Sequence, residues 1–288
     1  MRIAFLFLLA ISCRDAVAEN LPLLERMTER GIAITDDQTC VVPGPSLRSD
    51  QDAARRQEIL DDLAGGRGWK NFSRKSVSAP VAIDVKYVKD AGGARIGHQV
   101  HSAFIVHVPL ETLKNEEIME QLFGKPDDAE ETQDFALEEL TSEELKSVGI
   151  DAIGENESYG AIQMPLLKRV IVRGVIRTQK LVADDSVIVV WEIDPRFSSE
   201  SSGRNNWAPI EQDDLGKKHE GDKQIYRGAG GYMVVSQLSE LEGACLVESH
   251  IVLHEPEEWF RGSNVLRSKL PILMQESARS FRRKLMDK

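Results

Sequence analysis

The sequence predicts an α+β fold, in which a curved antiparallel sheet packs on a long C-terminal helix and a helical extension precedes the sheet. Three patterns support this prediction. Apolar and polar residues alternate with the period of β-strands in several segments between residues 81 and 254. Apolar residues recur at helical spacing in the last segment, 263–288, and again near the N-terminus, before the first strand pattern.

The composition is that of a folded acidic protein. Of the 288 residues, 41% are hydrophobic and 29% are charged, which is enough apolar material for a sizeable core. Lys and Arg total 36 against 47 Asp and Glu, so the net charge is -11. Because a negative chain repels phosphate, we expect no binding to nucleic acid.

The first 18 residues have the pattern of a secretory signal peptide. Arg2 precedes an apolar run, and 16–18 is the small-x-small sequence that precedes cleavage. We expect cleavage after Ala18 and a secreted or periplasmic protein without a transmembrane segment, since no later apolar stretch reaches the roughly 20 residues of a membrane span. Lipidation at Cys13 is an alternative, although Ala10 stands where a lipoprotein signal usually has Leu.

Two cysteines remain after removal of the signal peptide. In an oxidising compartment Cys40 and Cys245 could form one long-range disulfide. The bridge would close a loop of about 200 residues and stabilise the fold by ~4 to 5 kcal/mol in the chain-entropy model. The alternative is a pair of free thiols, because Cys245 lies in an apolar strand pattern.

We expect two regions after the signal peptide. Residues 19–75 form the helical extension, with a helix stop at Gly65 and an extended connection at Pro43-Gly44-Pro45. Residues 76–288 form a single α+β domain. An acidic insertion over 109–158 interrupts its strands, and we expect two or three helices there, one of them begun by a capping box at 141–144.

The strand patterns outline an antiparallel sheet. Asp184-Asp185 joins two of them as a hairpin, and Gly228–Gly231 permits a bend in a curved sheet. A polar stretch from Asp194 to Gln224 predicts a long loop, a candidate mouth for a binding site. The six strand patterns cover residues 81–87, 100–108, 170–176, 187–193, 232–238 and 244–254.

The histidines do not predict a metal site. His98, His101 and His107 belong to one strand pattern, in which His98 and His101 point to opposite faces. His101 and His107 share a face but lie roughly 20 Å apart along a strand. One ion needs all its ligand atoms within about 2 Å of itself.

Two pairs of titratable residues are candidates for general acid-base chemistry. Glu248 and His250 lie about 7 Å apart on one strand face, and Glu192 and Asp194 have the same spacing. The opposite face of the 244–254 strand is more apolar, so we expect Glu248 and His250 in a solvated or cross-strand structural role. We assign no catalytic residue and no cofactor, and a hydrolase remains a minor alternative.

The C-terminal third carries a distinctive motif: Glu255-Pro256-x-x-Trp259-Phe260-x-Gly262-x-Asn264-x-Leu266-Arg267-Ser268-Lys269-Leu270-Pro271. This motif resembles that of a family of secreted bacterial proteins of unknown function, a resemblance that implies no activity. The order of helices, long strands, glycine-rich bend and terminal helix is similar to the START-like, or helix-grip, fold. That layout implies an apolar cavity between the sheet and the last helix.

We therefore expect a non-enzymatic protein that binds a lipid-like or other apolar ligand between sheet and helix. The same side chains could instead fill a solid core. An alternative function is docking of an envelope protein. The contact would be made by the acidic helices or by the strand face that carries Arg169, Arg173 and Arg177. The candidate ligand-binding residues are Trp207, Tyr232, Trp259, Phe260, Met274 and Phe281.

Overall fold

The computed structural model describes residues 21–115, 117–118, 136–198 and 202–286. The predicted signal peptide, including Cys13, and the middle of the acidic insertion lie outside the described residues. Within the described ranges, no helix combines the length and the apolar character needed to cross a membrane.

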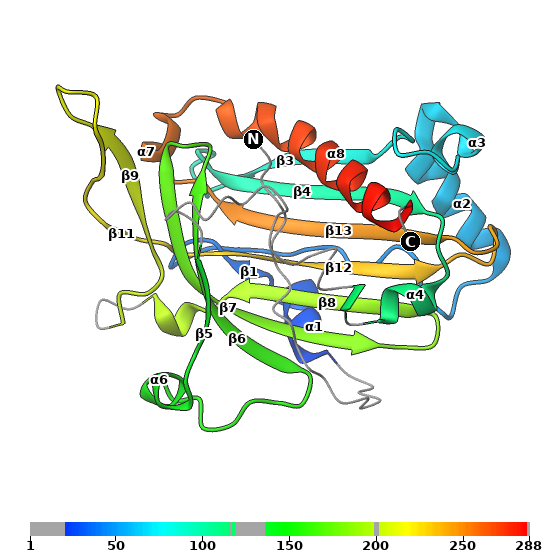
Figure 1. The fold of residues 1–288 in the computed structure, drawn as a ribbon, viewed down its shortest axis with the longest axis horizontal. Coiled ribbons are helices and arrows are strands. Elements are labelled where there is room, and N and C mark those ends of the chain that lie inside the picture. Colours follow the sequence, from blue (N-terminus) through cyan, green and yellow to red (C-terminus); the bar gives the residue numbers. More distant parts are fainter. Residues whose placement is uncertain (1–20, 116, 119–135, 199–201, 287–288) are drawn as a thin grey trace.

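A large antiparallel sheet forms the centre of the molecule (Figure 1). Its continuous part confirms the six predicted strand patterns and places them in one layer. Along the sheet these strands follow the order β7 (Val170–Val182), β8 (Ser186–Ile193), β12 (Ala229–Gln237), β13 (Cys245–His254), β4 (Arg95–Val106) and β3 (Ala82–Lys89).

The sheet branches at β7, the longest of these strands. The C-terminal half of β7 pairs with β8, its N-terminal half pairs with β9 (Asn206–Gln212), and β6 (Glu157–Leu166) runs antiparallel along its other edge. The remaining strands extend these two branches: β5 (Ala136–Glu139) pairs with β6, and both β10 (Lys218–Glu220) and β11 (Gln224–Ile225) pair with β9.

The helix α8 (Val265–Met286) lies across one face of the sheet, along β3 and β4 (Figure 1). It follows the short helix α7 (Glu257–Phe260) and includes Pro271 as an interior residue. Its buried stripe includes Leu270, Met274 and Phe281, at the spacing the sequence predicts. The predicted fold class, an antiparallel sheet packed on a long C-terminal helix, is confirmed.

The N-terminal extension covers the opposite face of the sheet. Leu23 and Met27 of α1 pack on β8 and β12, while α2 and α3 pack on β4 and β13. Asp52 caps α2 by accepting a hydrogen bond from Arg55 N at 2.8 Å. The elements are α1 (Pro22–Glu29), β1 (Ile32–Ala33), β2 (Thr39–Cys40), α2 (Ala53–Ala64), a 3-10 turn (Gly65–Arg67) and α3 (Trp69–Phe72).

The acidic insertion differs from its prediction in part. The helices α4 (Leu110–Lys114) and α6 (Ser142–Ser147) are present, and the Thr141–Glu144 capping box is confirmed. The segment around residues 136–139, predicted as helix, is strand β5, and β6 extends the sheet where no strand pattern was recognised. Pairing with β7 holds β6 in place despite interior Gly and Pro residues that weaken its sequence signal.

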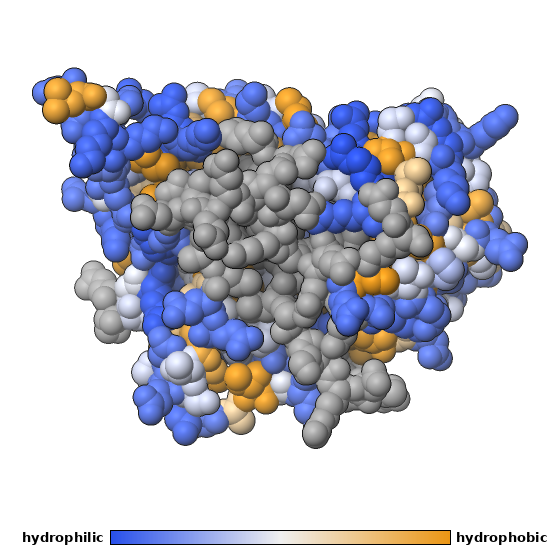
Figure 2. Space-filling view, in the orientation of Figure 1, coloured by the Kyte–Doolittle hydropathy of each residue, from blue (hydrophilic) through white to orange (hydrophobic). Residues whose placement is uncertain are grey.

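The predicted loop from Asp194 to Gln224 is also wrong in part, because β9 and β10 form a hairpin within it. The hairpin projects from one end of the sheet, at the upper left of Figure 1. Its side chains are mostly exposed, which leaves no apolar alternation to reveal the strands. The described surface in Figure 2 is mainly hydrophilic, and Leu215 at the hairpin tip is 94% exposed.

Of the two alternatives for Cys40 and Cys245, a disulfide or a pair of free thiols, the structure has the free thiols. Cys40 packs with the cluster beneath the N-terminal extension, whereas Cys245 belongs to the cluster beneath α8. Cys245 Sγ donates to Val108 O at 3.4 Å, and burial raises the pKa of this thiol to about 12. The two side chains are separated because they pack on opposite faces of the sheet.

Candidate functional site

A cavity of about 90 Å³ lies between α8 and the sheet. Its walls are predominantly apolar, and they come from four adjacent strands and one helix. The lining residues are Ser102, Phe104, Val189, Trp191, Tyr232, Met233, Val247, Ser249, Ile251, Met274, Ser277, Ala278 and Phe281.

Strand register accounts for the cavity. One row of directly opposed residues runs across the four adjacent strands β8, β12, β13 and β4, and all its side chains point to the α8 face. The row consists of Val189, Met233, Ser249 and Ser102. The two serines are small and hydrogen bond to each other, with 2.9 Å between their Oγ atoms. Ala278 is the small residue that α8 contributes opposite them. Small side chains on both walls leave space that larger residues would fill.

Three of the predicted ligand-binding residues line this cavity. Met274 and Phe281 belong to the buried stripe of α8. Tyr232 also lines it, but its aromatic ring packs 5.2 Å from the His250 ring in the opposite layer, and its hydroxyl donates to Pro43 O at 2.7 Å. Tyr232 therefore joins the sheet to the N-terminal extension.

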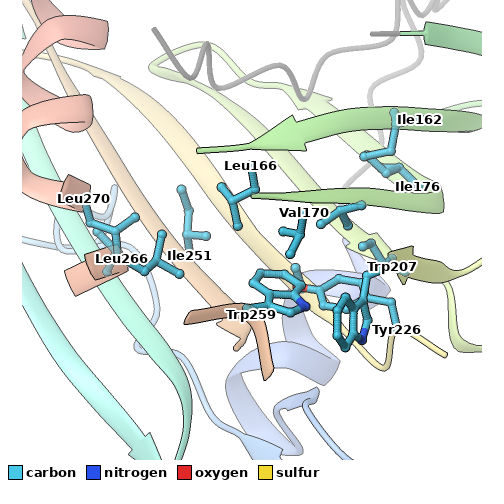
Figure 3. Packing of buried hydrophobic residues seen from close by; sticks show 14 of the residues in the cluster. Ile162, Leu166, Val170, Ile176, Trp207, Tyr226, Ile251, Trp259, Leu266 and Leu270 are labelled. Atoms are coloured by element: carbon cyan, nitrogen blue, oxygen red, sulfur yellow. The ribbon is translucent and has the colours of Figure 1, made fainter. Parts of the chain in front are cut away.

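The other three predicted residues belong to a core cluster at one end of the sheet (Figure 3). Trp259 stacks on Tyr226 with 5.4 Å between ring centroids, and it meets Trp207 edge-on at 6.0 Å. Phe260 packs edge-on against Trp259. These rings contact one another, so they close the end of the core and do not line the cavity.

The C-terminal motif joins α7 and α8 to the sheet. Glu255 is buried, accepts a hydrogen bond from Arg95 at 3.1 Å and pairs with His98. Asn264 Oδ1 accepts from Arg95 Nη1 at 2.7 Å and from the hydroxyl of Tyr87 at 3.0 Å. The motif residues with these contacts hold the start of α8 against β3 and β4.

A second cluster, on the other face of the sheet, brings together Glu248, His101, His250 and Ser46. Glu248 Oε1 lies 3.1 Å from His101 Nε2 and 3.2 Å from His250 Nε2. Ser46 donates to the same carboxylate through its hydroxyl at 2.7 Å and its backbone N–H at 2.9 Å. We call these four residues the Glu248 cluster.

Glu248 and His250 are buried beneath the N-terminal extension, so their predicted solvated position is wrong. Their predicted cross-strand role is correct, because His250 pairs with His101 in the register of β13 and β4. Burial alone would raise the pKa of Glu248. Hydrogen bonds from His101, His250 and Ser46 outweigh that effect and lower the pKa to about 2.

Sequence reasoning missed His101 because it compared histidines along one strand and not across strands. The ligand atoms of His101, Glu248 and His250 all lie within 4.8 Å of one another. However, the two imidazole rings are stacked, with centroids 4.2 Å apart and planes inclined by 16°. An imidazole nitrogen binds a metal with a lone pair in the ring plane, and two nearly parallel stacked planes cannot both contain one ion at about 2 Å. This geometry suits a hydrogen-bonded cluster.

Glu192 and Asp194, the other candidate pair, each form an ion pair with an arginine. Glu192 pairs with Arg26 of the N-terminal extension, and burial, followed by the charge of Asp194, raises its pKa against the effect of that arginine. Asp194 is held by Arg196, whose Nη2 lies 2.5 Å from Oδ2.

No family model and no curated protein matches the chain. The resemblance to a secreted bacterial family therefore stays a prediction. Several solved structures show a distant likeness in fold.

Human STARD10 has 14% identity and a TM-score of 0.42, over 82% of this chain and 84% of that one. The human StarD13 (DLC2) lipid transfer and protein localization domain has 9% identity and a TM-score of 0.37, over 70% and 83% of the two chains. An uncharacterised protein from Rhizobium leguminosarum has 8% identity and a TM-score of 0.34, over 72% and 99%.

Proposed function

We propose that this protein binds a small apolar ligand in the cavity between the sheet and α8. The carrying observation is the cavity itself, an apolar space beneath a helix with the hydroxyls of Ser102, Ser249 and Ser277 as its side-chain polar groups. Small-molecule sites are typically apolar clefts of this kind with a few polar groups. The Glu248 cluster lies on the other face and takes no part in this function.

The cavity volume sets the size of the ligand. An apolar protein cavity of about 150 Å³ accommodates benzene. At about 90 Å³, the space beneath α8 holds a short alkyl segment in the present conformation. A longer chain, whether lipid-like or the eight-carbon probe used below, requires α8 to move away from the sheet or the chain to extend beyond the cavity.

A cavity-filling substitution tests the proposal. Ala278→Leu adds three carbon atoms at a lining position that is 1% exposed, and Gln275→Leu introduces the same residue on the exposed side of α8 as a matched control. The probe is 1-octanol, detected by native mass spectrometry and by its effect on the unfolding temperature. We expect wild type and Gln275→Leu to bind the probe and Ala278→Leu to lose at least about tenfold in affinity, about 1.4 kcal/mol.

Failure of wild type to bind the probe, or equal binding by Ala278→Leu, would contradict the proposal. The first result would favour the alternative of a protein-interaction module. A folded Ala278→Leu variant is verified by its unfolding transition, so that loss of binding is separated from loss of structure.

Export is a separate proposal, based on the pattern of residues 1–18. N-terminal sequencing of protein from an envelope fraction should give a chain that starts at Glu19. A chain that keeps Met1 and stays in the cytosol would contradict cleavage, and a lipidated N-terminus at Cys13 would support the lipoprotein alternative.

A further inference from the structure

A second pocket, of about 400 Å³, lies at the C-terminal end of α8. One wall is apolar and includes Val106 and Leu285. The other carries Lys75, Ser76, His107 and Arg282. The cavity described above has no cationic lining residue, and no residue lines both spaces.

Arg282 is the central polar residue of this pocket, and it is 5% exposed. Pairing of β3 with β4 ends at Ala82, which leaves the carbonyl of Ile105 on β4 without a strand partner on that side. Arg282 Nε donates to this carbonyl at 2.9 Å, and its Nη atoms donate to Ala79 O at 2.6 Å and Pro80 O at 3.2 Å. The guanidinium is thus fixed in position by backbone acceptors.

These acceptors are neutral, so the charge of Arg282 is not compensated. No carboxylate pairs with Arg282 among the described residues, and burial together with the charges of Arg74 and Arg279 lowers its pKa to about 10. Lys75 lines this pocket, and Arg279 and Arg283 belong to the same end of α8. All three are exposed, and none forms an ion pair with a described residue. Within the part of the chain that the structure describes, positive charge without a paired carboxylate gathers here, in a chain whose net charge is -11.

Two aromatic rings separate this cationic pocket from the apolar cavity. Phe104 and Phe281 both line the cavity and meet edge-on, with 5.8 Å between ring centroids. The guanidinium carbon of Arg282 lies 5.2 Å from the centroid of the Phe104 ring. A molecule that displaced or bypassed this aromatic pair would contact the cationic pocket at one end and the apolar cavity at the other.

We propose that the pocket binds the anionic group of an amphiphile, a carboxylate or a phosphate, whose apolar tail enters the cavity beneath α8. This inference rests on the proposed function and specifies its ligand class. The uncompensated cations favour an anion, because a partly buried positive charge is stabilised by a nearby negative one. The apolar wall of Val106 and Leu285 favours an amphiphile over a free anion.

The experiment compares four probes on the full chain: octanoate, octyl phosphate, 1-octanol and inorganic phosphate. Octanoate and octyl phosphate should bind about tenfold more tightly than 1-octanol. This is the effect expected of two exposed charges, those of Lys75 and Arg279. Inorganic phosphate should bind far more weakly than octyl phosphate. Rising salt concentration should narrow the difference between octanoate and 1-octanol, because salt screens the charges.

A charge-neutralised variant and a matched control complete the test. Lys75→Gln with Arg279→Gln should lose most of the preference for octanoate while its affinity for 1-octanol stays within twofold of wild type. Arg30→Gln with Lys217→Gln removes one arginine and one lysine charge at exposed positions elsewhere, directly after α1 and in the turn of the β9–β10 hairpin, and should leave the preference unchanged.

The outcomes separate the two proposals. Equal affinity of wild type for octanoate and 1-octanol would overturn the anionic inference and leave the proposed function standing. Binding of inorganic phosphate as tight as that of octyl phosphate would show a free-anion site and overturn the amphiphile. An absence of binding by every octyl probe would overturn the proposed function and the inference with it.

Discussion

The two faces of the central sheet use neighbouring positions of the same strands for opposite purposes. On the α8 face, the row Val189, Met233, Ser249 and Ser102 borders a cavity. A shift of one residue along each strand gives the neighbouring row, which packs beneath the N-terminal extension. It consists of Val190, Tyr232, His250 and His101. The first row has small or flexible side chains at its centre, whereas the second has three rings.

This difference shows how one sheet can combine a rigid side with an adaptable one. Beneath the N-terminal extension, rings stack and Glu248 accepts four hydrogen bonds, so any displacement leaves buried polar groups without partners. Beneath α8, contacts are mainly apolar and the packing is incomplete. Apolar contacts are non-directional, so α8 can shift at a lower free-energy cost than the extension can.

The largest expected effect comes from removal of Glu248. Glu248→Ala leaves His101, His250 and Ser46 without their shared acceptor, and we expect the free energy of unfolding to fall by about 3 to 5 kcal/mol. Urea unfolding measures the change, and limited proteolysis of residues 41–52 reports release of the extension.

Glu58→Ala is the control for that experiment, because Glu58 forms an exposed ion pair with Arg55. Its loss should cost less than about 1 kcal/mol. A Glu248→Ala protein as stable as the Glu58→Ala protein would mean that the Glu248 cluster does not hold the extension on the sheet.

Acidification should lower the stability that Glu248 contributes to the packing of the N-terminal extension on the sheet. The pKa of Glu248 is about 2 in the folded protein and near 4.5 ordinarily. Since the folded value is depressed, the contribution of Glu248 is fully present above pH 4.5 and is lost as the pH falls towards 2. The pKa difference corresponds to about 3 kcal/mol. Unfolding free energies of wild type and Glu248→Gln between pH 7 and pH 2.5 should converge on acidification, and parallel curves would contradict this assignment.

A smaller effect is expected from the serine pair on the α8 face. Either Ser102→Ala or Ser249→Ala leaves one hydroxyl without its partner, at a cost of about 1 kcal/mol. The double substitution should cost less than the sum of the two, because it removes both hydroxyls. A double-mutant cycle measured by urea unfolding gives this coupling, and strictly additive losses would show that the hydrogen bond contributes nothing.

The smallest effect is expected from a reducing agent. Cys40 and Cys245 are free thiols on opposite faces, so the unfolding midpoint of purified protein should be the same with and without reductant. A disulfide would add ~4 to 5 kcal/mol to the free energy of unfolding. A mass 2 Da below that of the reduced chain would show that the bridge forms and that the two faces are linked covalently.

Much of the fold could be predicted from local pattern. Alternation in β7, β8 and β13 and helical spacing in α8 identified these elements, because each buries one side and its period shows in the sequence. The hairpin of β9 and β10 was missed because only its first residues, Asn206–Ala208, are buried, whereas the end of β9, the turn and β10 are mostly exposed and show no apolar alternation.

The sequence by itself determined six of the strands, the C-terminal helix α8 and the alternation that assigns Glu248 and Ser249 to opposite faces. Only the tertiary structure decided that both faces are buried and that small side chains leave a cavity beneath α8. It also decided that His101 of β4 contacts Glu248 of the adjacent strand β13. The physical reason is that alternation depends on nearest neighbours along the chain. Register, layer packing and unfilled volume depend on residues far apart in sequence.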